Sequence, residues 1–164
     1  MKLTDAIANH ITDVYNGENW TGVNFETTLR DVTFEDATTV TKASVNTIAK
    51  LLYHTAFYNN IALERINGNN PAINNDNGFD MPAITSKKEW NQLLKDFGAS
   101  VTRLANAVAK FPEDRLWQIN PRGNGTFYQL FHGIAEHMHY HLGQVVILKN
   151  LLQQEKEETS RSGL

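Results

Sequence analysis

Four long stretches of this 164-residue sequence repeat apolar residues at the spacing of an α-helix, and none alternates apolar and polar residues as a strand does. They cover about residues 4–15, 46–66, 86–108 and 126–153. Each stretch carries one apolar stripe, which a small domain must bury against its neighbours. The sequence therefore predicts an all-α fold, with a four-helix bundle as the simplest architecture.

Local signals mark the ends of these helices. Ser86 with Glu89, and Thr126 with Gln129, form capping-box patterns, in which two side chains satisfy free backbone amides. A shorter helix is expected around residues 34–40. The loop after the Asn67-Gly68 stop signal has about 17 residues, longer than a bundle hairpin needs. It is long enough to recross the length of a helix, which would leave the second and third helices parallel.

Length and composition predict a single domain. Residues 1–154 account for it, and the charged, apolar-poor residues 155–164 are expected to form a frayed C-terminal tail. The formal net charge of −3 excludes the basic surface typical of proteins that bind nucleic acid or anionic membranes. No run approaches the roughly 18 apolar residues of a membrane span, and no hydrophobic signal region follows Met1. We therefore expect a cytoplasmic protein that binds neither nucleic acid nor membrane.

The absence of cysteine narrows the chemistry further. It excludes disulfides, thiolate zinc sites, iron–sulfur clusters and a cysteine nucleophile. Any metal ion must therefore be bound through nitrogen and oxygen atoms.

The histidines carry most of the functional information, because four of the six lie between residues 132 and 141. His137 and His141 are one helical turn apart, so their imidazoles can reach one metal ion. His54 is the best third candidate, since its helical neighbours are apolar and predict that it faces the bundle interior. His54 should lie about 20 Å from the end of its helix, and His137 and His141 roughly 17–22 Å from the start of theirs. If these two helices are antiparallel, the three rings meet at one level.

Simpler interpretations exist for each histidine. An inward-facing histidine can be a hydrogen-bonded core residue, and pairs at this spacing also arise by chance. His10, His132 and His139 are interpreted as surface or packing residues, with a place near an open metal position at a subunit interface as an alternative for His139. A zincin needs a glutamate directly after the first histidine of the pair, where this chain has Met138. A ferritin-like di-iron site needs more glutamate ligands than this chain offers.

Two segments resemble the DinB-like family. Thr47-Ile-Ala-Lys-Leu-Leu-Tyr-His54 is similar to the start of the family's second helix, where a Ser or Thr precedes the first ligand by seven residues. His137-Met-His-Tyr140-His141-Leu-Gly143-Gln144 is similar to the more specific signature on its last helix. The resemblance implies an up-down-down-up four-helix bundle, often dimeric, that holds a divalent metal through His54, His137 and His141. Many members carry Asp where this chain has Met138, so a role for that position in proton transfer is in doubt.

Gly143 and Gln144 have a physical interpretation of their own. A glycine inside a helix costs about 1 kcal/mol relative to alanine, so Gly143 suggests close approach by a neighbouring helix. Gln144 lies on the same side as His137 and His141, where its amide could orient an imidazole or a bound water. The alternative is that Gln144 only bridges polar groups in the bundle.

Three neutral imidazoles leave a metal ion at least one open position, as in catalytic sites. Zn is the first choice, and Ni or Fe also suit nitrogen ligands. The resemblance implies a metal-dependent transferase or hydrolase that activates a small thiol or water and acts on a small-molecule substrate. It also implies a homodimer. No catalytic residue is assigned. The alternative is a non-catalytic stress-response or binding module with a structural metal. Substrate specificity is expected from residues 16–44 and 67–84, where Phe79 could line a pocket or anchor a loop.

Overall fold

The computed structural model describes residues 1–162, and every regular element in that range is a helix. The four longest are α1 (Leu3–Asn16), α4 (Ile48–Ile66), α5 (Lys87–Ala109) and α6 (Phe127–Ser162). Two short α-helices, α2 (Phe25–Leu29) and α3 (Phe34–Thr38), follow α1, and the 3₁₀ helix η1 (Glu113–Arg115) follows α5. The prediction of an all-helical fold is confirmed.

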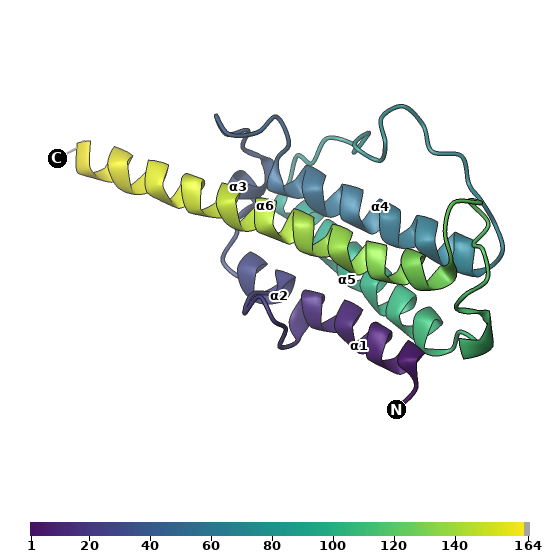
Figure 1. The fold of residues 1–164 in the computed structure, drawn as a ribbon. Coiled ribbons are helices and arrows are strands. Elements are labelled where there is room, and N and C mark those ends of the chain that lie inside the picture. Colours follow the sequence, from purple (N-terminus) through teal and green to yellow (C-terminus); the bar gives the residue numbers. More distant parts are fainter. Residues whose placement is uncertain (163–164) are drawn as a thin grey trace.

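The four long helices lie side by side (Figure 1). Helix α4 packs against α5 and α6, and α1 packs against the other sides of the same two helices. The loop after α4 returns along the length of that helix before α5 begins (Figure 1). Helices α2 and α3 lie beside the C-terminal half of α6, where Lys149 donates hydrogen bonds to the Thr28 carbonyl and the Asp31 carboxylate.

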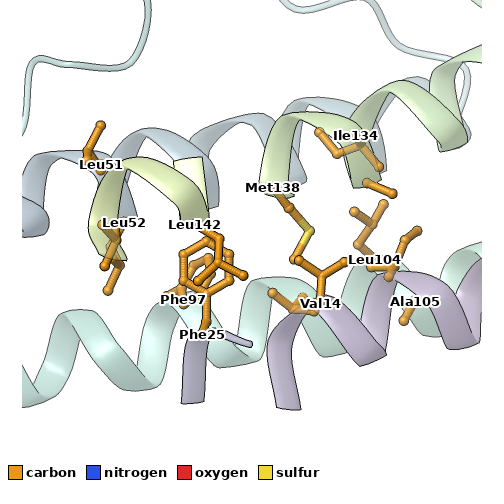
Figure 2. Packing of buried hydrophobic residues seen from close by; sticks show 14 of the residues in the cluster. Val14, Phe25, Leu51, Leu52, Phe97, Leu104, Ala105, Ile134, Met138 and Leu142 are labelled. Carbon is orange, nitrogen blue, oxygen red and sulfur yellow. The ribbon is translucent and has the colours of Figure 1, made fainter. Parts of the chain in front are cut away.

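The apolar stripes predicted from the sequence meet in one core. Figure 2 shows Met138 and Leu142 of α6 pointing into it, with Val14, Phe25, Phe97 and Leu104 nearby. Met138 is fully buried, so this position of α6 serves packing. A core built from these stripes requires one face of α6 to point inward, and His137 and His141 lie beside that face.

The predicted helix starts are confirmed at both capping patterns. Ser86 accepts a hydrogen bond from the Glu89 amide, and at the start of α6 Thr126 and Gln129 cap each other reciprocally. In α5 the Glu89 carboxylate reaches Thr85 instead of Ser86. The prediction missed α2, whose five residues are too few to show a helical period and which begins at an Asn24 cap.

The predicted end of the last helix near Gln153 was too early, because α6 continues to Ser162. Opposite charges one turn apart on a helix stabilise it, and Arg161 pairs in this way with Glu157 at 3.8 Å. Lys156 also forms an ion pair with Asp36 of α3 at 2.6 Å, which ties this part of α6 to the bundle. Residues 163–164 of the expected tail lie outside the described part of the chain. Within the described residues, no helix is long and apolar enough to span a membrane.

The expectation that Gly143 marks close helix approach is wrong. A Cβ placed on Gly143 would meet no atom within 4 Å among the described residues. The glycine lies on the exposed face of α6, so the close packing between helices must come from other positions.

Candidate metal centre

His54, His137 and His141 meet between α4 and α6, as was expected if these two helices are antiparallel. The Nε2 atom of His137 lies 3.1 Å from Nε2 of His54 and 3.0 Å from Nε2 of His141. One ligand atom from each ring lies within 4.8 Å of those from the other two. Two of the three side chains are almost completely buried, with 3% of His54 and 5% of His141 exposed.

The outer nitrogens of two rings determine where their protons lie. His54 Nδ1 is 2.9 Å from the Asn77 carbonyl, and His141 Nδ1 is 2.7 Å from Oε1 of Gln144. Both oxygens accept hydrogen bonds, so both Nδ1 atoms carry the proton. Gln144 thus lies beside an imidazole, at the position predicted for it. The side-chain amide nitrogen of Gln144 donates a hydrogen bond to the Tyr140 hydroxyl.

With the protons on Nδ1, the Nε2 atoms of His54 and His141 present lone pairs to the same point. His137 Nε2 can donate a proton to one of them and not to both. Burial, together with the neighbouring His141, lowers the pKa of His54 to about 4 and that of His137 to about 3. The rings are thus neutral near pH 7. No additional proton is therefore present to bridge the nitrogen lone pairs that face one another.

A divalent cation fits this donor set. Zn–N bonds of about 2.0–2.1 Å in a tetrahedral site put neighbouring nitrogens about 3.3 Å apart, close to the two short separations here. Neutral histidine is a common ligand, and hydrogen bonds from Nδ1 to oxygen acceptors hold such ligands in orientation. His137 Nδ1 is buried with no hydrogen-bond partner among the described residues, so this ring alone lacks an outer acceptor.

The loop after α4 covers the His54 side of the cluster. The Phe79 ring stacks on the His54 imidazole with centroids 4.0 Å apart, so Phe79 anchors the loop on the candidate ligand. Asn77 has a positive φ of 53°, and its side chain accepts a hydrogen bond from the Tyr58 hydroxyl. Gly78, with φ 74°, packs so closely on the Phe57 ring that no side chain would fit. This turn brings the Asn77 carbonyl to His54.

The remaining histidines lie away from this centre. His139 stacks on His10 with ring centroids 5.4 Å apart, and its Nδ1 donates to the Ala135 carbonyl. His132 packs against Tyr128. These contacts agree with the prediction of packing roles. Met138 lies in the core, so it offers no polar group to the cluster.

A cavity of about 280 Å³ reaches the cluster at His137. Its walls come from α4, the first turns of α6 and the turn that precedes α6: Tyr58, Ala62, Arg65, Asn120, Arg122, Asn124, Gln129, Leu130, Gly133, Ile134 and His137. Neither of the segments expected to control specificity, residues 16–44 and 67–84, contributes to this wall. A larger cavity of about 520 Å³ lies between α4 and α5, and none of the three histidines lines it.

Sequence patterns did not single out Tyr58, Asn77, Arg65 or Arg122 as functional. Tyr58 lies against His137 with ring centroids 4.9 Å apart. One signal was available for Arg65, which lies in the last turn of α4 on the same side as Tyr58, seven residues earlier. Nothing local in the sequence distinguishes Arg122 or Asn77.

The family model described as the DinB superfamily matches residues 19–145, a range that includes all three clustered histidines and every residue that lines the cavity at His137. No curated protein and no solved structure matches the chain.

Proposed function

Because the chain belongs to the DinB superfamily, we propose that His54, His137 and His141 bind one divalent metal ion in an up-down-down-up helical bundle. The convergence of the three Nε2 atoms supports this ligand set. Zn is the first choice, with Ni or Fe as alternatives, because imidazole ligands suit all three. Asn77 and Gln144 orient the rings of His54 and His141.

The proposed activity is that of a metal-dependent transferase or hydrolase acting on a small molecule. The cavity at His137 carries this proposal, since it gives a ligand of modest size access to the cluster from one side. When bound, the cation would lower the pKa of a water or substrate thiol. The chain has no cysteine, so any thiol must arrive with the substrate or a co-substrate.

The chain's own residues have separate tasks in this scheme. The three imidazoles hold the cation, and the Phe79 ring shields His54 from solvent. Leu130 and Ile134 form an apolar wall of the cavity, while Tyr58 lies at its junction with the cluster. The Tyr58 hydroxyl donates to Asn77, so it is held in place beside His137.

A structural metal in a non-catalytic binding module is the second candidate. The deep burial of His54 and His141 and the covering loop favour it, because structural sites are closed. Dimerisation and a cytoplasmic location stay predictions.

Metal analysis of the purified protein, followed by turnover assays with thiol and ester substrates before and after chelation, separates these functions. Binding of one metal equivalent with chelator-sensitive turnover supports the enzyme. One metal equivalent whose removal unfolds the protein, with no turnover of any substrate, supports the structural role. Absence of metal binding at micromolar zinc contradicts both.

A further inference from the structure

A buried arginine, Arg65, lines the cavity beside the histidine cluster. Only 5% of the surface of Arg65 is exposed. The Nε atom of this arginine has no hydrogen-bond partner among the described residues. Within residues 1–162 its guanidinium forms no ion pair. A buried charge normally has a counter-ion or a full set of hydrogen bonds, because desolvation costs several kcal/mol. Arg65 therefore lacks a group that its position requires.

A second arginine faces the same space. Arg122 lines the cavity from the turn before α6, and its positive charge adds to burial in lowering the pKa of Arg65. The turn is well held: Asn120 accepts a hydrogen bond from the Arg122 amide at 2.9 Å and donates its own amide to the Gly125 carbonyl. The backbone of Arg122 is thus positioned before any ligand arrives.

No carboxylate in the described part of the chain forms an ion pair with either arginine. Among the described residues that line the cavity, none is Asp or Glu, and the polar ones are neutral amides, a tyrosine and His137. A net charge of −3 for the whole chain makes a purely cationic cavity unusual for this surface. Two guanidinium groups without carboxylates between them attract an oxyanion, which arginine binds through paired N–H donors.

We propose that this cavity binds a small molecule through a carboxylate or phosphate group held by Arg65 and Arg122. The inference rests on the proposed function, because it identifies the substrate class of the same site. His137 lines the same cavity, so the anionic group is bound beside the metal cluster while another part of the molecule faces it. Arg65 and Arg122 are positioning residues that select anionic substrates.

Binding is tested by calorimetry on the full chain in metal-free form, with succinate and inorganic phosphate as separate probes at constant ionic strength. Succinamide, which has the shape of succinate without its charge, is the control ligand. We expect saturable binding of at least one anion and none of succinamide. Binding of succinate alone identifies a carboxylate site, and binding of phosphate alone identifies a phosphate site.

Three variants locate the binding site. Arg65→Met replaces the buried cation by an apolar side chain of similar length. Arg122→Gln changes an exposed residue, so this substitution should leave the fold intact. Each should weaken anion binding at least tenfold. The matched control is Arg103→Gln, an exposed arginine that lines the other cavity; it should change the dissociation constant less than twofold.

Three results would overturn the proposal: no saturable binding of either anion, no effect of Arg122→Gln, or a loss caused by Arg103→Gln. A separate zinc titration of the same metal-free proteins keeps the two proposals apart. Anion binding without zinc binding contradicts the proposed function alone, whereas zinc binding without anion binding contradicts only this inference.

Discussion

At the scale of single residues, the candidate site depends on which ring nitrogen carries the proton. Asn77 and Gln144 each accept a hydrogen bond from an Nδ1 atom, and this leaves the Nε2 lone pairs of His54 and His141 directed at His137. A sequence shows that three imidazoles can meet, but it does not show their tautomers. The acceptor for His54 is a backbone carbonyl 23 residues away, which no side-chain pattern reveals.

Replacing His137 by alanine should abolish stoichiometric zinc binding. Loss of an outer-shell partner typically weakens metal binding roughly 10–100-fold, and loss of a ligand should cost more. The matched control is His139→Ala, which removes a histidine two residues away that stacks on His10. Zinc content after dialysis, measured by atomic emission, is the readout. Full zinc content in His137→Ala would show that the ligand set is wrong.

The stability of the metal-free protein should fall as the pH drops below 6.5. The folded state lowers the histidine pKa values, to about 4 for His54, so the unfolded chain binds more protons between pH 4 and 6.5. The histidines therefore impose no cost above pH 6.5, and they destabilise the fold progressively as the pH approaches 4. The lowered carboxyl pKa values of Asp31 and Asp36 act below this window.

Urea denaturation at a series of pH values measures this slope. A His137→Gln variant, which removes one titrating ring, should show a shallower dependence between pH 4 and 6.5. An equal slope in the two proteins would mean that the cluster does not cause the effect.

At the scale of elements, the loop between α4 and α5 contributes to the site through its turn at residues 77–79. The length of this loop was evident from the sequence, and so was its position between two helices. The contact of this loop with His54 was not evident, because it depends on Gly78 fitting against Phe57 of α4. Local patterns predict where a chain leaves a helix and carry little information about which side chain a long loop covers.

Gly78→Ala should weaken zinc binding without abolishing it. A Cβ at position 78 would lie 2.5 Å from the Phe57 ring, so the loop must move and take the Asn77 carbonyl and the Phe79 ring from His54. The loss of these partners should reduce affinity roughly 10–100-fold. Zinc affinity is measured by competition with a chelator of known strength.

Gly22→Ala is the matched control, since Gly22 has a similar φ of 70° but no atom within 4 Å of its Cβ position. It carries the backbone cost of a left-handed alanine, about 1–2 kcal/mol, without a clash. Equal zinc affinity in both variants and the wild type would show that the loop does not support the site.

At the scale of the whole molecule, one side of α6 holds both the core and the metal cluster. Met138 packs into the centre of the bundle (Figure 2). Its neighbour His137 contacts His54 of α4 instead. Stability and metal binding are therefore separable by changing adjacent residues of one helix.

Met138→Ala should lower the free energy of unfolding of the metal-free protein by about 2–5 kcal/mol, through lost burial and a cavity. Ile147→Ala, an exposed position on the same helix, should change it by less than about 0.5 kcal/mol. Urea denaturation gives both values. At temperatures where Met138→Ala is folded, it should still bind one zinc equivalent; loss of zinc from the folded variant would mean that core and site are coupled.

The sequence by itself determined the helical class, the helix starts at Ser86 and Thr126, and the position of His137 and His141 on one face of their helix. These features follow from periodicity and from side chains that act within one or two helical turns. Only the tertiary structure decided that Asn77 and Phe79 cover His54, that Gly143 is exposed, and that Arg65 and Arg122 share a cavity with His137. Each of those facts joins residues far apart in the chain, and such contacts arise from packing between elements that local spacing does not encode.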